Sequence, residues 1–267
     1  MHLRKYPYYV DSIINLLTRF DDPVFILKIF LGQHKPESAQ VRLRKSGLRF
    51  NVRGAMDIWS IKETFIDLFY ERFGTPISDG WTIIDVGAGI GDFTIFAACQ
   101  HPSNRVFAYE PYAQSFSILC ENLRLNRLDN ALVFAQAVSG QSGHVQLDTS
   151  GGEPLQIQSE ETVDAVGGED HVSLVPSVSL ADVLAQNEIK RCDLLKLDCE
   201  GAEYAILFNT GPEKLRRIDR IVMEYHEGVT DYDHTDLERF LIESGYRIRI
   251  TPNYVHNNLG YLYADRF

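Results

Sequence analysis

The 267 residues suffice for one large α/β domain or two small ones, and 45% hydrophobic with 24% charged residues is ordinary globular composition. Lysine and arginine number 26 against 37 aspartate and glutamate, so the net charge is −11. Because proteins that bind nucleic-acid duplexes normally carry a basic surplus, we expect no nucleic-acid partner, although a local basic patch is not excluded.

The cysteines and the apolar segments argue against several further classes. The four cysteines form no C-x-x-C pair, which argues against a zinc ribbon and favours reduced structural thiols. The longest apolar stretch, residues 13–31, contains four charged residues and a proline and cannot span a bilayer. The N-terminus shows no secretory signal pattern, so we expect a cytoplasmic protein without a membrane partner.

Residues 1–80 predict a small helical and β-hairpin cap. Two short amphipathic helices over residues 8–31 are separated at Asp21-Asp22-Pro23, because proline favours the first position of a helix. Alternating apolar residues over 41–53 predict a hairpin that turns at Lys45-Ser46-Gly47. Its outer face suits either solvent or contact with an anion, since it carries Arg42, Arg44, Arg49 and Arg53.

The segment after the hairpin has helical spacing. Apolar residues at three- and four-residue steps predict one helix over residues 58–73. Glu63 and Tyr70 are seven positions apart, so they would share one face of this helix, two turns apart. They would either reach a ligand bound on the following domain or face solvent.

From Trp81 onward, short apolar runs alternate with helical segments. The expected strands are 82–86, 105–109, 131–138, 193–197 and 220–225, and the expected helices are 92–100, 112–126, 202–209 and 236–243. Such alternation is typical of βαβ units in a Rossmann-like, doubly wound and mostly parallel sheet. Strands over 246–251 and 259–264 are too close in sequence for a crossover helix, so they should form an antiparallel hairpin.

This pattern predicts an α/β domain over residues 81–267. Within it, residues 149–170 are rich in glycine and acidic residues and lack lysine and arginine. We expect a mobile acidic surface insertion there, a candidate lid, and assign it no secondary structure.

A glycine loop is the strongest functional signal. In Ile83-Ile-Asp-Val-Gly-Ala-Gly-Ile-Gly-Asp-Phe-Thr94, a buried strand runs into Gly87, Gly89 and Gly91 and then into a helix. Glycine allows a tight turn and close approach of a ligand, and the helix N-terminus offers free N–H groups. The third glycine comes one residue too early for the dinucleotide pattern G-x-G-x-x-G, and Asp85 before the loop suits a cationic ligand better than a pyrophosphate.

A second acidic residue follows at the end of the next strand. Glu110 in Val106-Phe-Ala-Tyr-Glu-Pro111 lies where a Rossmann-like unit places the carboxylate that accepts ribose hydroxyls. With this residue, the sequence resembles the FkbM family of class I S-adenosylmethionine (AdoMet)-dependent methyltransferases over roughly residues 40–265. The most specific part of the resemblance is Asp193-Leu-Leu-Lys-Leu-Asp-Cys-Glu-Gly-Ala-Glu203, in which Cys199 replaces the small apolar residue expected there. Further matching segments are Asp85–Thr94, Val106–Pro111, Arg53–Glu63, Ala135–Ser139 and Ile221–His226.

The resemblance implies a seven-stranded sheet with a reversed last hairpin and AdoMet as the methyl donor. It places the methionyl part of AdoMet at the glycine loop, the ribose at Glu110 and the adenine near the segment Ala137–Ser139. The cofactor-binding residues expected on this basis, with Glu63 added from the cap, are Glu63, Asp85, Gly87, Ala88, Gly89, Gly91, Glu110, Pro111, Ala137 and Val138.

Reacting groups gather at the carboxyl ends of the strands in open α/β sheets. That rule selects Asp198, Glu224 and His226 as candidate catalytic residues, with Glu200 close by. His226 has a suitable ordinary pKa for a base, but a structural histidine at a strand end is an equal alternative. The acids could bind Mg²⁺, hold a sugar by hydrogen bonds or cap a helix, and no metal site is predicted. Lys196 in the core strand should pair with one of these acids.

These features predict in-line methyl transfer, with a hydroxyl oxygen of a small molecule, natural product or glycan as the acceptor. A nicotinamide-dependent oxidoreductase and a non-catalytic AdoMet-binding module are the alternatives. The sequence does not indicate the oligomeric state.

Overall fold

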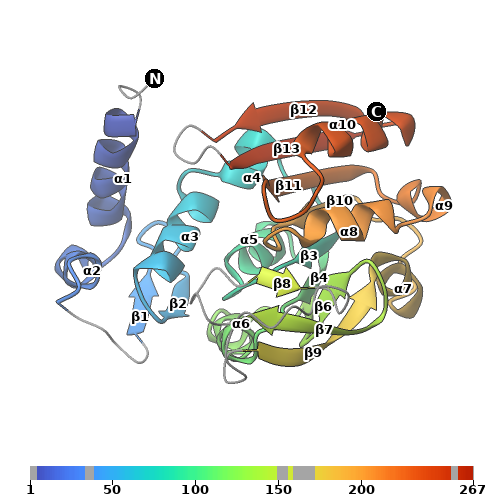
Figure 1. Cartoon of the computed structure of the whole chain (residues 1–267). Helices are drawn as coiled ribbons and strands as arrows, with labels where there is room; N and C mark the ends of the chain where they lie inside the picture. Colours follow the sequence, from blue (N-terminus) through green and yellow to red (C-terminus); the bar gives the residue numbers. More distant parts are fainter. Residues whose placement is uncertain (1–4, 34–38, 149–155, 159–171, 254–257, 267) are drawn as a thin grey trace.

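The computed structural model describes residues 5–33, 39–148, 156–158, 172–253 and 258–266 (Figure 1). The helices in these ranges are α1 (Lys5–Arg19), α2 (Pro23–Phe30), α3 (Ala55–Phe65), α4 (Phe69–Phe73), α5 (Asp92–Gln100), α6 (Ala113–Leu125), α7 (Leu180–Gln186), α8 (Ala202–Phe208), α9 (Pro212–Leu215) and α10 (His234–Glu243). The strands of the central sheet are β3 (Thr82–Val86), β4 (Arg105–Tyr109), β5 (Ala131–Phe134), β10 (Leu194–Leu197), β11 (Arg220–His226), β12 (Arg247–Pro252) and β13 (Leu259–Asp265). None of the described helices is both long and apolar enough to cross a membrane.

The central sheet has seven strands in the order β12-β13-β11-β10-β3-β4-β5. Neighbouring strands from β11 to β5 run parallel, whereas β13 runs antiparallel to both β11 and β12. The predicted fold class, a mostly parallel doubly wound sheet with an antiparallel C-terminal hairpin, is therefore confirmed. The carboxyl ends of β3, β4, β10 and β11 meet at one edge of this sheet.

Helices cover both faces of the sheet because side chains alternate along each buried strand. On β3, Ile84 and Val86 pack into a core shared with α7, α8 and α10, whereas Ile83 packs into a core shared with α5. On β10, Leu195 and Leu197 join the first core, and Lys196 points to the opposite face. This alternation places a lysine inside the protein, beside the end of β3.

A second, smaller sheet was not predicted. It has the strand order β6-β9-β7-β8 and is formed by β6 (Ala137–Ser139), β7 (Gly143–Asp148), β8 (Gln156–Gln158) and β9 (Val172–Ser179). The single strand expected over residues 131–138 is wrong, because β5 ends at Phe134 and β6 belongs to this other sheet. Most of the expected acidic insertion over 149–170 lies outside the described residues; its described part is β8, which pairs with β7.

The single helix expected over residues 58–73 is also wrong. The backbone carbonyl of Lys62 accepts the amides of both Ile66 and Asp67, which ends the regular helix, and Leu68 is left-handed with φ 54°. The ammonium group of fully buried Lys62 lies 2.6 Å from the carboxylate of Asp67, so an ion pair holds the chain in this break. The break separates α3 from α4, and it redirects α4 toward β11 and β13.

The N-terminal elements pack against α5 and α6 rather than standing apart. The hairpin of β1 (Ala39–Arg42) and β2 (Arg49–Val52) forms as predicted, and Asn51 of β2 donates its amide to Asn122 of α6 at 2.6 Å. The helix break at Asp22-Pro23 is also confirmed, because Asp22 caps α2 by accepting the amide of Phe25. The division of the chain at residue 80 stays a prediction.

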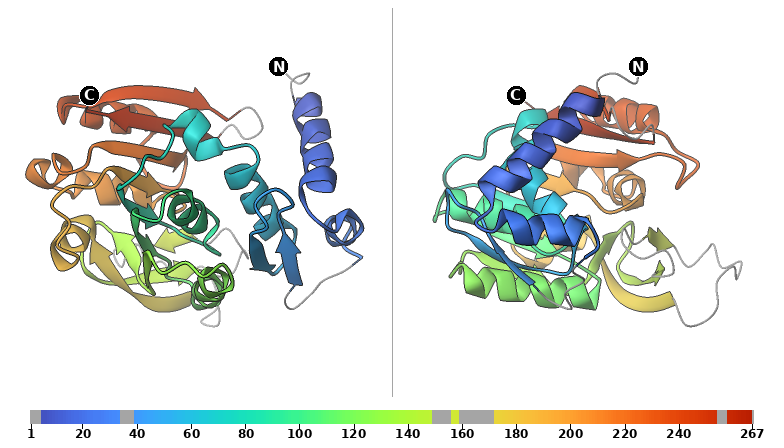
Figure 2. Two further views of the ribbon diagram at one scale, coloured as in Figure 1. Left: turned by 180° about the vertical axis from the view of Figure 1, so that it is seen from behind. Right: turned by 90° about the vertical axis from the view of Figure 1, so that its left-hand side faces the viewer.

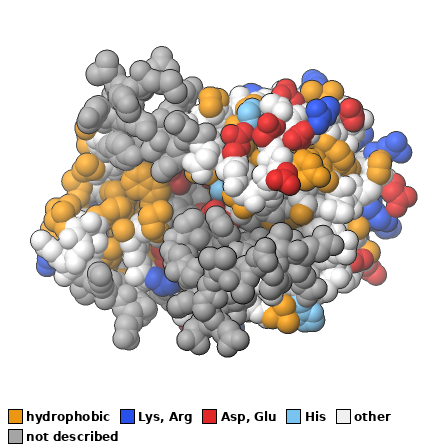
Figure 3. Space-filling model, in the orientation of Figure 1, with side chains coloured by type: hydrophobic (Ala, Val, Ile, Leu, Met, Phe, Trp, Pro, Cys, Tyr) orange, Lys and Arg blue, Asp and Glu red, His pale blue; other side chains and the backbone are white. Residues whose placement is uncertain are grey.

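Helices α1 and α2 lie at one end of the molecule, beyond α3 (Figure 2). Hydrophobic side chains gather over this end in the space-filling view (Figure 3), and Ile13, Ile14, Val24 and Leu27 are among the exposed ones. Leu16 of α1 and Phe20, directly after this helix, are buried in the core shared with α6.

The break between α3 and α4 can be tested through its ion pair. Asp67→Ala removes the carboxylate that faces buried Lys62, so we expect the free energy of unfolding to fall by about 3 kcal/mol, as for other broken buried pairs. Urea denaturation measures the loss. Exposed Asp129→Ala serves as the control and should change stability by less than about 0.5 kcal/mol; equal effects of the two substitutions would contradict the proposed importance of the pair.

Candidate active site

A cavity of about 600 Å³ lies at the carboxyl ends of β3, β4, β10 and β11. Helices α3 and α4 form the opposite wall and contribute Trp59, Ser60, Glu63 and Tyr70. The volume is in the range of a small-molecule site, and its lining mixes apolar surface with converging charged groups. The N-terminal segment is thus part of the site, not only a cover for the sheet.

The glycine loop forms one side of the cavity. Gly87 has φ 72°, and a Cβ atom there would lie 1.8 Å from the backbone oxygen of Asp198, so only glycine allows the loop to pack against the end of β10. Gly89 has φ 54°, and a Cβ atom there would project into open space, so the loop leaves room for a ligand at this point. The amides of Gly87 and Ala88 donate to the carbonyl of Tyr109, which ties the loop to β4.

Glu110 supports the same loop. One of its carboxylate oxygens accepts the amide of Gly89 at 2.7 Å, and the other accepts the amide of Tyr112 at 2.8 Å. It lines the cavity together with Pro111, Ala137 and Val138. A carboxylate oxygen has a second acceptor position, so Glu110 can still accept from a ribose hydroxyl.

Three of the predicted cofactor-binding residues do not line the cavity. Asp85 is fully buried and accepts from the Thr94 hydroxyl at 2.6 Å. Ala88 is buried, and Gly91 caps α5 close to Leu119, where a Cβ atom would lie 2.3 Å from the leucine side chain. Their positions show that these three residues shape the loop, and their expected contact with a cofactor stays a prediction.

Lys196 joins the glycine loop to the end of β10. Its ammonium group lies 3.1 Å from Asp85 and 4.0 Å from Asp198, and it donates to the carbonyl of Gly87 at 2.8 Å. Burial alone lowers the pKa of Lys196, but Asp85, Asp198 and Asp92 outweigh it and raise the pKa above its ordinary value. Pairing with one of Asp198, Glu200 and Glu224 was expected, and Asp198 is in range, but the closer partner, Asp85, was not expected.

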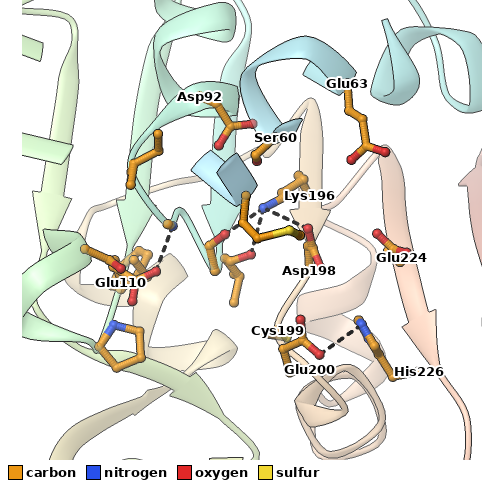
Figure 4. A pocket seen from close by; sticks show the side chains of 18 of the residues that line it. Ser60, Glu63, Asp92, Glu110, Lys196, Asp198, Cys199, Glu200, Glu224 and His226 are labelled. Atoms are coloured by element: carbon orange, nitrogen blue, oxygen red, sulfur yellow. Dashed lines mark hydrogen bonds and ion pairs between the residues drawn. The ribbon is translucent and has the colours of Figure 1, made fainter. Parts of the chain in front are cut away.

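Acidic side chains converge on the wall opposite Glu110 (Figure 4). Asp198 accepts from the Tyr70 hydroxyl at 3.0 Å, and Glu63 accepts from the Trp59 indole at 2.7 Å. Burial, and then the nearby Asp198, raise the pKa of Glu224 well above its ordinary value. Glu63 and Tyr70 belong to different helices, so their expected shared helix face is wrong, although both line the cavity.

His226 lies between two carboxylates. Its Nε2 is 3.2 Å from Glu200, and its Nδ1 is 3.3 Å from Glu203. Burial lowers the pKa of His226, but the carboxylates of Glu203, Asp198 and Glu200 outweigh it and raise the pKa to about 10. The imidazole therefore keeps its proton at neutral pH, which does not suit the role of general base considered for it from the sequence.

One possible metal-binding arrangement occurs among the described residues. One ligand atom each from Asp198, Glu200 and His226 lies within 4.8 Å of the others. Glu200 and His226 face each other as an ion pair, and Asp198 contacts Tyr70 and Lys196, so we assign no metal to the group.

Several lining residues were missed by sequence reasoning. Trp59, Ser60 and Glu63 all lie on α3 and line the cavity. The sequence pointed only to Glu63, because the packing of α3 against the sheet is seen only in the structure. Asp92 opens α5 and has a raised pKa because it is buried, although a hydrogen bond from Thr64 opposes the shift. Its position directly after the glycine loop was the available signal.

Comparison with known proteins identifies the family. Residues 85–248 match the family model described as the methyltransferase FkbM domain. The chain belongs to this family of methyltransferases. The predicted resemblance is thereby confirmed, and the matched segment runs from β3 into β12.

The relatives of this FkbM domain protein include two microbial methyltransferases. It is 30% identical over 193 residues to the 31-O-demethyl-FK506 methyltransferase FkbM of Streptomyces tacrolimicus, covering 62% of this chain and 73% of that protein. It is 28% identical over 187 residues to methyltransferase 1 of Beauveria bassiana, covering 64% and 74%. The solved methyltransferase FkbM of Methylobacillus flagellatus superposes with a TM-score of 0.49 at 13% identity, over 79% of this chain and 54% of that one.

The close packing of the glycine loop against β10 gives a stability prediction. Gly87→Ala adds both left-handed strain and a clash with the Asp198 backbone, whereas Gly80→Ala adds only strain, since Gly80 has φ 74° and open surroundings. We expect Gly87→Ala to lower the free energy of unfolding by at least about 2 kcal/mol more than Gly80→Ala. Parallel urea denaturation curves check this, and equal losses would contradict the packing argument.

The absence of an assigned metal is tested by thermal unfolding. A divalent ion bound only by the native FkbM protein would raise its Tm by mass action. We expect the same Tm in EDTA, MgCl₂ and MnCl₂. A rise with either salt that Glu200→Gln removes would show that the acids bind a metal.

Proposed function

We propose that the protein transfers the methyl group of AdoMet to a hydroxyl oxygen of a small molecule, natural product or glycan. The observation that carries the proposal is that one cavity contains both the glycine loop with Glu110 and, on its opposite side, the acidic residues Glu63, Asp198 and Glu224. The loop side suits a nucleoside-containing donor, and the other wall leaves space and polar groups for an acceptor. Bound AdoMet supplies an electrophilic methyl group on a sulfonium.

The chain's residues fit AdoMet in three respects. Gly89 leaves open space beside the loop, Glu110 offers acceptor positions for ribose hydroxyls, and Ala137 and Val138 provide an apolar surface for an adenine. Asp198 lies near the glycine loop, where a carboxylate favours a cationic sulfonium or ammonium group. Membership of a methyltransferase family supports this donor over the nicotinamide alternative.

The choice of oxygen as the acceptor atom rests on two observations. Carboxylates and carboxyl groups of Glu63, Asp198 and Glu224 can accept from and donate to hydroxyl groups, as polyols and sugars require. The relative from Streptomyces tacrolimicus is named for methylation of an oxygen. Ser60 and Tyr70 on the N-terminal wall add neutral hydroxyl groups next to these acids.

Calorimetry with AdoMet tests the donor. We expect saturable binding, about tenfold to a hundredfold weaker in Glu110→Ala, because hydrogen bonds to a charged group are worth about 1.5–3 kcal/mol. Gly89→Arg should abolish binding by filling the open space. Exposed Glu213→Ala is the control and should bind like the unmodified protein. Absence of saturable binding by the folded protein would contradict the proposal.

Transfer of a labelled methyl group tests the acceptor. Incubation of the protein with methyl-labelled AdoMet and a small-molecule and glycan extract should label a compound whose new methyl group NMR assigns to oxygen. A new methyl group on nitrogen or carbon would overturn the O-methyl assignment while leaving the dependence on AdoMet intact.

A further inference from the structure

The turn between β10 and α8 presents one glutamate to the cavity. Glu200 has a left-handed backbone with φ 56°, and Gly201 follows with φ 103°. Left-handed conformations of residues other than glycine cost energy and persist where their surroundings enforce them, often at functional sites. Here the surroundings do so: Glu203, fully buried, accepts the amides of both Cys199 and Gly201 at 2.8 Å.

The same buried carboxylate also holds the histidine that faces Glu200. Glu203 lies 3.3 Å from Nδ1 of His226, and Nε2 of His226 lies 3.2 Å from Glu200. The three side chains therefore form a chain from the protein interior to the cavity. Glu203 and His226 are buried, whereas the Glu200 side chain is 26% exposed, so Glu200 is the most open of the three to a ligand (Figure 4).

This turn lies directly against the glycine loop. The backbone oxygen of Asp198, two residues before Glu200, occupies the space that a side chain on Gly87 would need. Gly87, Asp198 and Glu200 all line the same cavity. A group held at Glu200 is thus next to the part of the cavity where the methyl donor is proposed to bind.

We propose that Glu200 is the catalytic base that removes the proton of the acceptor hydroxyl, and that His226 and Glu203 position it. The proposal rests on the proposed O-methyl transfer. The O–H bond of the acceptor breaks and its proton passes to a carboxylate oxygen of Glu200. The acceptor oxygen forms the new bond to the methyl carbon, and the electron pair of the broken carbon–sulfur bond stays on sulfur.

The electrostatic surroundings of Glu200 are compatible with this role. Burial raises the pKa of Glu200 to about 7, the positive His226 on β11 opposes the shift, and Asp198 and Glu203 add to it. A base is most effective when its pKa is near the working pH. At neutral pH the carboxylate form of Glu200 is well populated and binds a proton readily, whereas the carboxylate of an ordinary exposed glutamate is a much weaker base.

The other candidates are less suited to accept the proton. His226 already carries one between two carboxylates. Asp198 is committed to the Tyr70 hydroxyl at 3.0 Å and to Lys196 at 4.0 Å. Burial, and then Asp198, raise the pKa of Glu224 well above its ordinary value, which disfavours the carboxylate form that a base requires.

Carboxyl ¹³C NMR on protein labelled at glutamate Cδ tests the titration without any acceptor. We expect a resonance with a midpoint near pH 7 that is missing from Glu200→Gln and present in Glu188→Gln. Glu188 is a matched control, because it is also left-handed, with φ 52°, and exposed outside the cavity. His226→Gln removes the positive neighbour, so the midpoint should move to higher pH. A Glu200 resonance that titrates in the ordinary glutamate range would overturn the proposal.

The role of Glu200 in catalysis is tested by the pH dependence of labelled-methyl transfer to the acceptor identified in the extract. Glu200→Gln should lower turnover about 10²- to 10⁴-fold, the usual contribution of a general base, with AdoMet affinity changed less than about threefold. Glu200→Asp should retain a rising limb with pH, and Glu188→Gln should match the unmodified protein. Turnover by Glu200→Gln with an unchanged rising limb would overturn the proposal.

The two proposals fail in different ways. If AdoMet does not bind to the folded protein, the proposed function fails, whatever the titration of Glu200 shows. If AdoMet binds and a hydroxyl is methylated but Glu200→Gln keeps its activity, only the base assignment fails.

Discussion

The active site depends on one buried ammonium group. Lys196 is almost fully buried, and it sits opposite Asp85 in the register of β10 and β3. An unpaired charge in such a place would be very costly, so the contacts with Asp85 at 3.1 Å and with the Gly87 carbonyl at 2.8 Å are needed to offset the loss of water. These contacts fix the glycine loop to the end of β10. They thereby set the distance between the loop and the acidic residue Asp198 that follows β10.

The role of Asp85 follows from this ion pair. An acid that ends the strand before a glycine loop suggested direct contact with a cationic ligand. In the folded protein its carboxylate is used by Lys196 and Thr94, both within the chain. Asp198, which reaches the same ammonium only at 4.0 Å, is open to the cavity and is the acid available to the cationic group of the proposed donor. Asp85 and Asp198, which have similar positions at strand ends, thus have different roles, because only Asp85 is fully buried.

Sequence patterns predicted the helices and strands that depend on the local spacing of apolar residues. They failed where contacts between residues distant in the sequence determine the structure. β3, α5 and β4 have the predicted bounds, because each is a buried run between clear turn signals. The helix break at Leu68 was missed, since apolar spacing continues through it and the ion pair of Lys62 with Asp67 shows only in three dimensions. The small sheet was missed because β6 pairs with β9, which lies far along the chain. For the same reason, Glu63 was the only cavity-lining residue of α3 that the sequence predicted.

Residue type proved a weaker guide to acid–base chemistry than environment. Histidine has an ordinary pKa near neutrality, which favoured His226 as the base. Burial lowers the pKa of His226, but the carboxylates of Glu203, Asp198 and Glu200 outweigh it and raise the pKa to about 10. Burial raises the pKa of Glu200 to about 7. These shifts favour Glu200 over His226 as the proposed base. Pairs of titratable groups whose surroundings push their pKa values in this way commonly reveal the assignment of acid and base. Here the decisive neighbour, Glu203, contributes from α8 and never reaches the cavity.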